Sequence, residues 1–215
     1  MKQQKNNIKL SENLINNYDE IMINFIKKNM KLKNYDFFEV GNYNFNLIAI
    51  RNKTNLNANL FNDNLFVIFK NDFSEWELKR FKITTDAGLY YRRNLANVNG
   101  FAIVKPGQYK SVFKLGLHKG EHPALVQNKP IDVYRDKDLN GAIDIDKTKV
   151  YTGMFGIDMH STNYSNIDFK DVNKWSAGCQ VFQSQLEFEY FLELMRRQKG
   201  NTYSYTLFSS DELVF

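Results

Sequence analysis

The chain has 215 residues, of which 43% are hydrophobic and 25% charged, with a net charge of +5. This length and apolar content are enough for the core of one large domain and exclude a disordered chain. No apolar run approaches the ~20 residues of a membrane span, and the first residues lack the continuous apolar stretch of a secretion signal. The basic residues are dispersed rather than gathered in an arm or block. We therefore expect no integral membrane segment and no nucleic-acid partner.

The first element expected is a helix, after which the spacing of the apolar residues changes from helical to strand-like. Apolar residues at helical spacing predict a helix that begins after an N-cap at Ser11 and ends in a lysine-rich stretch near Lys31. Asn34 then begins a break, and beyond it the period shortens to that of strands. We therefore predict a helical extension over residues 1–40 and a body over residues 41–215.

The body contains short apolar runs that are separated by turn residues. These runs predict strands over Phe45–Ile50, Leu65–Phe69, Trp76–Ile83, Ala102–Val104, Tyr109–Leu115, Ala124–Gln127, Ile131–Arg135, Val150–His160 and Tyr203–Phe208. A helix is predicted near the end, between a capping box of Ser184 and Glu187 and a stop at Gly200. The pattern is typical of an α+β protein that is mainly β, a sandwich or barrel with flanking helices.

The single cysteine, Cys179, cannot form a disulfide within the chain. His160 ends a predicted strand nineteen residues upstream, and an imidazole is the usual base for a cysteine nucleophile. Gly178 permits a tight turn that aims backbone N–H groups at a developing oxyanion. Ser161 is placed to orient the imidazole through its carbonyl or its side chain, and Ser176 to anchor the loop. The alternative interpretation is a core cysteine beside an unrelated histidine.

This segment resembles the active-site signature of L,D-transpeptidases of the YkuD type, in which a histidine lies some fifteen residues before Ser/Thr-His-Gly-Cys. The resemblance covers roughly residues 43–208 and includes Phe61–Asp63, Thr84–Gly88, Gly107–Tyr109, Gly116–His118, Tyr134–Asp136 and Phe155–His160. It implies a YkuD-like β-sandwich or barrel in which Cys179 attacks a carbonyl of a peptidoglycan stem peptide, with His160 as base. It also implies that no cofactor is needed and that the protein acts at the bacterial cell wall or periplasm.

Two positions depart from the signature. Ala177 stands where the signature has a second histidine, and Gln180 opens a segment that lacks the usual Arg or Asn. The nucleophile and its base are kept, so the resemblance still implies acyl transfer through a thioester. Transpeptidation, hydrolysis by a carboxypeptidase, endopeptidase or phage-type lysin, and non-catalytic binding to the wall stay open. We expect Ser176, Trp175, His118 and Gln180 to contact the substrate.

Two further patterns suggest metal ligands. His118 and His122 form an H-x-x-x-H pair that could bind zinc together with His160, but a glycine within the pair and a proline after it oppose the helix that this spacing needs. Residues 136–144 copy the first half of an EF-hand loop, with Lys147 at the position of the bidentate glutamate. We therefore expect a tight hairpin of Asx turns there, and no metal site.

Other classes of cysteine enzyme fit the residue order less well. A sortase uses His, Cys and Arg in this order on a β-barrel, and Arg196 or Arg197 lies downstream of the cysteine. Those arginines fall in the last turn of a predicted helix, and a sortase separates its His and Cys by far more residues. Papain-like and NlpC-type hydrolases place the cysteine before the histidine, the reverse of the order here.

Overall fold

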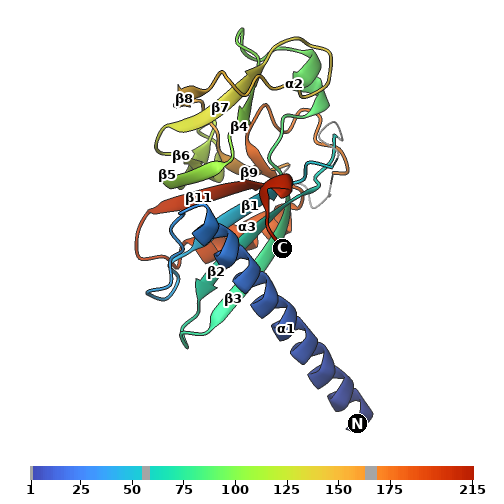
Figure 1. Cartoon of the computed structure of the whole chain (residues 1–215), viewed down its shortest axis with the longest axis vertical. Coiled ribbons are helices and arrows are strands. Elements are labelled where there is room, and N and C mark those ends of the chain that lie inside the picture. Colours follow the sequence, from blue (N-terminus) through green and yellow to red (C-terminus); the bar gives the residue numbers. More distant parts are fainter. Residues whose placement is uncertain (1, 55–58, 163–168) are drawn as a thin grey trace.

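A computed structural model of the chain describes residues 2–54, 59–162 and 169–215. Within them, eight strands close into a barrel in the order β1, β11, β5, β6, β9, β10, β3 and β2 (Figure 1). The barrel strands are β1 (Asn46–Arg51), β2 (Asp63–Lys70), β3 (Trp76–Thr84), β5 (Gly107–His118), β6 (His122–Gln127), β9 (Met159–Ser161), β10 (Gln180–Phe182) and β11 (Thr202–Ser209). The expected class, α+β and mainly β, is confirmed.

A small antiparallel sheet covers one end of the barrel. It consists of β4 (Phe101–Val104), β7 (Ile131–Asp136) and β8 (Tyr151–Gly153), in that order, and lies in the upper part of Figure 1 near the short helix α2 (Leu89–Arg93). Apolar side chains of β4 and β7, among them Val104 and Val133, belong to the same core cluster as the barrel interior. The two sheets therefore share one core, because β4 and β7 each turn an apolar face toward the barrel.

The N-terminal helix α1 (Lys2–Leu32) is longer than the sequence predicted and extends away from the barrel at its N-terminal end (Figure 1). Near its C-terminal end, Ile23, Ile26 and Met30 are buried against residues of β1, β2, β3 and β11. Asn29 donates a hydrogen bond to the Val214 carbonyl at 3.2 Å and accepts one from its amide at 2.8 Å. This part of α1 thus packs into the body of the protein; the division at residue 40 stays a prediction.

The helix near the C-terminus, α3 (Gln185–Met195), follows the predicted start signal. Ser184 is its N-cap, and its hydroxyl accepts a hydrogen bond from the Glu187 amide at 3.4 Å. The helix ends at Met195 rather than running to Gly200. Its apolar face, including Phe188 and Phe191, packs into the barrel core. The chain then forms β11 and a short 3-10 turn, η1 (Ser210–Glu212).

The single strand predicted over Val150–His160 is wrong. The segment forms β8 in the small sheet and β9 in the barrel, and the chain crosses between the sheets around Gly156, whose φ is +69°. The carbonyl oxygen of the Gln127 side chain accepts the amides of Phe155 at 2.9 Å and Ile157 at 3.0 Å. These bonds pair backbone groups that lie between β8 and β9 and have no strand partner. After them the chain enters the barrel as β9.

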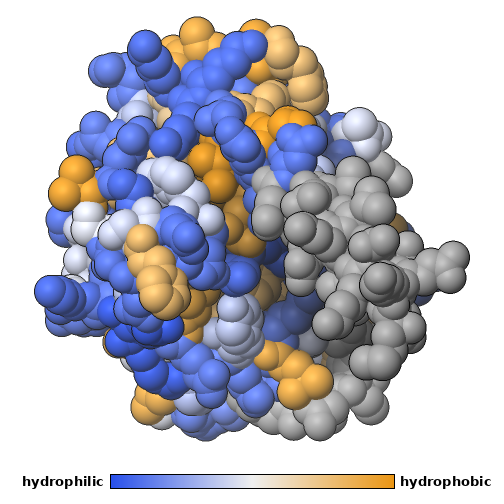
Figure 2. Space-filling view, turned by 90° about the horizontal axis from the view of Figure 1, so that it is seen from below, coloured by the Kyte–Doolittle hydropathy of each residue, from blue (hydrophilic) through white to orange (hydrophobic). Residues whose placement is uncertain are grey.

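In the coloured part of the face seen in Figure 2, hydrophilic residues predominate, and hydrophobic residues lie between them. Isolated hydrophobic residues of this kind are normal on a protein surface. Among the helices of the described ranges, none combines the length and the apolar character that crossing a membrane requires.

Candidate active site

The candidate base lies on one strand of the barrel, and the candidate nucleophile lies just before the adjacent parallel strand. His160 is the middle residue of β9, and Cys179 comes directly before β10. The two strands pair in parallel with His160 opposite Val181, so Cys179 is two residues away from the position across from His160. Parallel neighbours have their ends at the same edge of the sheet, and this arrangement brings the imidazole and the thiol together.

A second histidine joins them from β5. The ligand-capable atoms of His118, His160 and Cys179 all lie within 4.8 Å of one another. The two imidazole rings are stacked, with centroids 4.1 Å apart and planes 15° from parallel. Asp158 accepts a hydrogen bond from Nδ1 of His118 at 2.8 Å. The sequence predicted a role for His118 but not for Asp158, whose position two residues before His160 on an alternating segment was the available signal.

His160 is held with one nitrogen engaged and the other free to act as a base. Its Nδ1 lies 2.8 Å from the Ser161 carbonyl, which can only accept, so Nδ1 carries the proton and Nε2 has the lone pair. The residue is 6% exposed. Burial, and after it the neighbouring His118, lower the pKa of His160 to about 4. The imidazole is therefore neutral near pH 7, the form that accepts a proton.

Cys179 is half-buried and its resting state is the thiol. Burial raises the pKa of Cys179 to about 12, with the Asp158 carboxylate acting in the same direction and a backbone hydrogen bond at Asp158 acting against it. The Sγ–H group donates to the Gly156 carbonyl at 3.4 Å. A preformed thiolate–imidazolium pair is thus disfavoured, and proton transfer from Cys179 to His160 has to accompany attack on a carbonyl.

The turn before the cysteine requires glycine at position 178. Gly178 has a φ of +136°, and a Cβ atom there would lie 2.6 Å from the Ala102 carbonyl oxygen. Its amide donates to the Ser176 hydroxyl at 3.1 Å, so it does not point at a substrate. The Ala102 amide in turn donates to the Ala177 carbonyl at 3.2 Å. β4 therefore holds the turn directly, and the Gly178 amide that the sequence suggested for an oxyanion is already bonded within the turn.

Two residues expected to contact substrate lie inside the protein instead. Ser176 is 1% exposed and its hydroxyl donates to the Cys179 carbonyl at 2.9 Å. Gln180 is fully buried and accepts a hydrogen bond from the Tyr205 hydroxyl at 2.7 Å. Both side chains are buried next to the start of β10. Ser176 anchors the loop, as the sequence predicted, and Gln180 ties the turn to β11; both polar side chains are hydrogen-bonded inside the protein.

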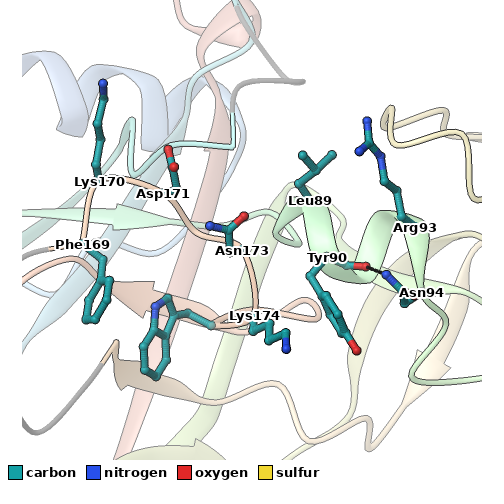
Figure 3. Close-up of a pocket in the computed structure, with 10 residues that line it drawn as sticks. Leu89, Tyr90, Arg93, Asn94, Phe169, Lys170, Asp171, Asn173 and Lys174 are labelled. Atoms are coloured by element: carbon teal, nitrogen blue, oxygen red, sulfur yellow. Dashed lines mark hydrogen bonds between the residues drawn. The ribbon is translucent and has the colours of Figure 1, made fainter.

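Trp175 lines a different cavity from the one that contains Cys179. The Trp175 pocket has a volume of about 740 Å³ and lies between α2 and residues 169–175. Tyr90 and Lys174 also line it (Figure 3). The Lys174 ammonium lies over the Tyr90 ring, 4.5 Å from its centroid. Trp175 packs against Phe169, with ring centroids 5.0 Å apart. It is thus a cavity wall, as expected, but it does not line the Cys179 cavity.

The loop over residues 136–144 forms the Asx turns that the sequence predicted, but the tight hairpin predicted there is wrong, because β7 ends at Asp136 and its partner β8 begins only at Tyr151. Asp136 accepts the amides of Asp138 at 3.3 Å and Asp144 at 2.7 Å, and the Asn140 side chain accepts the amide of Ala142 at 2.6 Å. These bonds close the loop through its own side chains.

The donor set of His118, His160 and Cys179 consists of two imidazoles and a thiol, which is chemistry that zinc accepts. Binding a metal would consume the free thiol and the free imidazole that the geometry places side by side. His122 lies outside this set: it pairs with His118 across the β5–β6 hairpin, and its ring is 3.5 Å from Glu121. We therefore interpret the cluster as a proton-transfer site.

Comparison with known proteins gives no relative for this chain, so the description of the site rests on its geometry. The chain matches no protein-family model, no curated protein and no solved structure. In the described part of the chain, the fold and the site together form a closed β-barrel with a histidine on one strand and a cysteine just before the adjacent parallel strand, an arrangement suited to nucleophilic chemistry at a carbonyl.

Proposed function

We propose that the protein is a cysteine-dependent acyl transferase that acts on the stem peptides of peptidoglycan. The observation that carries the acyl-transfer part is the placement of Cys179 within 4.8 Å of a neutral, oriented His160. The substrate class is inferred from the resemblance of the His160–Cys179 segment to YkuD-type L,D-transpeptidases. The site of action would then be the bacterial cell wall or periplasm.

The proposed reaction passes through a thioester. Cys179 Sγ attacks the peptide carbonyl carbon as its proton passes to Nε2 of His160, and the Cys179 amide faces the oxyanion. The C–N bond then breaks, and His160 returns the proton to the departing amine. In the second half an amine or a water molecule attacks the thioester carbon and gives its proton to His160. The C–S bond breaks, and the thiolate that leaves takes the proton back from His160.

The identity of the second nucleophile separates the two variants of this proposal. An amine acceptor gives transpeptidation, and water gives hydrolysis at the same bond. Ala177 offers no second imidazole in the turn, so the acceptor has to be identified by its product. A third variant, a binding domain without catalysis, predicts that Cys179 is dispensable.

The test is incubation of purified muropeptides with the protein, followed by mass spectrometry. We expect loss of a terminal D-Ala or cleavage of a crosslink if water is the acceptor, and a new dimer or an exchanged D-amino acid if an amine is. Cys179→Ser and His160→Gln should abolish the product. His122→Gln is the matched control, because this histidine lies on the same hairpin as His118 but outside the cluster. Product that persists in Cys179→Ser would overturn the proposal.

A further inference from the structure

The cavity that contains Cys179 has one charged side chain on its wall. Its volume is about 350 Å³, at the lower end of the range of small-ligand sites. The described residues that line it are Ala96, Asn97, Gly100, Phe101, Ala102, Arg135, Met154, Phe155, Gly156, Ile157, Ala177 and Cys179. Arg135 is the only ionised group among them, and none of them is acidic. The cavity therefore joins a nucleophile and a cation on a wall that carries no carboxylate.

Arg135 is fixed in this cavity while part of its guanidinium stays available. Its Nη1 donates to the Gly100 carbonyl at 2.9 Å, and the guanidinium carbon lies 4.8 Å from the centre of the Phe155 ring. Burial lowers the pKa of Arg135. Within the described ranges no carboxylate forms an ion pair with it. A planar cation with free N–H groups and no partner charge is suited to bind a carboxylate in a bidentate manner.

The backbone connects Arg135 rigidly to the nucleophile. Arg135 on β7 pairs with Ala102 on β4. The Ala102 amide donates to the carbonyl of Ala177, two residues before Cys179. Arg135 also lies on the same face of β7 as the core residue Val133, because alternate residues of a strand share a face. Its side chain thus stands where that face passes from the core into the cavity.

We propose that Arg135 is a carboxylate-binding residue that positions an acidic acyl donor beside Cys179. The substrate assignment rests on the acyl transfer proposed above and makes it more specific. The donor is a short peptide with a free carboxylate close to the bond that Cys179 attacks. Two carboxylates of a stem peptide have this chemistry: the one at the C-terminus, and the one on the side chain of a diamino diacid residue.

A test that needs no peptide substrate is alkylation of Cys179, the chain's single cysteine. Iodoacetate carries a carboxylate and iodoacetamide is its neutral counterpart, so the ratio of their rates reports an anion site next to the sulfur. Relative to the ratio for a small free thiol, we expect the protein to favour iodoacetate about tenfold, the effect of one charge-assisted contact. Arg135→Gln should remove this preference, and Arg135→Lys, which keeps the charge but loses the planar guanidinium, should keep only part of it.

The matched control is Arg80→Gln. Arg80 also lies near a phenylalanine ring, with its guanidinium carbon 6.0 Å from the centre of Phe66, and it donates a hydrogen bond to Asn64 at 2.8 Å. It does not line the Cys179 cavity, so its loss should leave the ratio unchanged. Because both reagents are compared on the same protein, partial destabilisation of a variant affects both rates alike.

Three results would overturn the proposal. The first is a wild-type ratio equal to that of the free thiol, and the second is a preference that survives Arg135→Gln. The third is a folded protein that neither reagent alkylates even at a pH high enough to ionise part of the thiol, because the cavity would then not admit even a two-carbon acid. If Arg135 produces the preference but no stem peptide is turned over, the carboxylate site stands and the proposed peptidoglycan substrate fails.

The source of the carboxylate is identified with stem peptides amidated at one position or the other. Amidation of the bound carboxylate should lower kcat/KM about 10- to 100-fold in the wild-type protein and have little effect in Arg135→Gln. Amidation of the other carboxylate should leave both proteins unchanged. If Arg135→Gln loses activity equally on the free and on both amidated peptides, the residue supports the fold and does not bind the donor.

Discussion

Two cavities lie on either side of the turn that carries Cys179, and the larger is not the one with the reactive groups. The pocket at Trp175 has a volume of about 740 Å³ and is lined by aromatic residues and by charges of both signs. The cavity at Cys179 has a volume of about 350 Å³, a backbone-rich wall and one cation, Arg135. Size and aromatic content therefore do not locate the chemistry in this protein.

The turn itself explains why the two cavities differ. The Ser176 carbonyl accepts the Gly88 amide at 2.9 Å on the side of α2, and the Ala177 carbonyl accepts the Ala102 amide at 3.2 Å on the side of β4. Trp175, one residue before the turn, faces the first side. Cys179, at its end, faces the second. A rigid turn thus separates a nucleophile from an aromatic surface only four residues away, and the predictions below test whether the two sides are independent.

The largest effect is expected from Gly178→Ala. A methyl group there would clash with the Ala102 carbonyl at 2.6 Å and would strain a φ of +136°. Together these effects should lower the free energy of unfolding by about 4 kcal/mol. Gly120→Ala is the control, because Gly120 also has a positive φ, +77°, but has open space around it; it should cost about 1 kcal/mol. Chemical denaturation measures both. Equal costs would mean that the turn is not held against β4.

The next effect concerns pH and His160. The unfolded histidine takes up a proton below about 6.5 and the folded one only below about 4, so the unfolded state binds more protons in between and stability falls as the pH drops through this window. The loss amounts to up to about 3 kcal/mol. Burial raises the pKa of Asp63, which acts in the opposite direction. The measurement is therefore the difference in unfolding free energy between wild type and His160→Gln, in which Asp63 cancels.

That difference should shrink toward pH 4 as the wild type loses the advantage of a neutral imidazole. A wild-type minus His160→Gln difference that stays constant from pH 7 to pH 4 contradicts the burial of a neutral His160.

A smaller effect is expected from Asp158→Asn. The carboxylate accepts hydrogen bonds from His118 and from the Gln127 amide. Its neutralisation should therefore lower the free energy of unfolding by about 1.5 kcal/mol. Its charge also raises the pKa of Cys179. Removing that charge should increase the thiolate fraction and speed alkylation at pH 8 about two- to fivefold. Intact-protein mass spectrometry follows the reaction, and slower alkylation would show that Asp158 assists the thiol rather than suppressing ionisation.

The smallest effect is expected on the other side of the turn. Lys174→Gln removes the cation over Tyr90 and should change the unfolding free energy by less than about 0.5 kcal/mol. The alkylation rate of Cys179 should stay within about twofold of wild type, because this pocket shares no lining residue with the Cys179 cavity. A larger change in rate would show that the two cavities are coupled through the turn.

The sequence alone determined most of the strands, the start of α3 and the pairing of a cysteine with a histidine. These features depend on residues close together in the chain: strand period, the Ser184 cap, and Gly178 beside Cys179. Ser161 was also predicted to orient the base, and its carbonyl bonds the His160 imidazole.

Only the tertiary structure decided which side chains share a cavity. His118 and Asp158 meet across forty residues of chain, and the pairing of β7 with β4 places Arg135 in the cavity that contains Cys179. The split of the predicted strand over Val150–His160, and the burial of Gln180, likewise follow from two sheets that share one core. Local pattern specifies period and turn chemistry, whereas the composition of a cavity and the pKa of its groups depend on long-range packing.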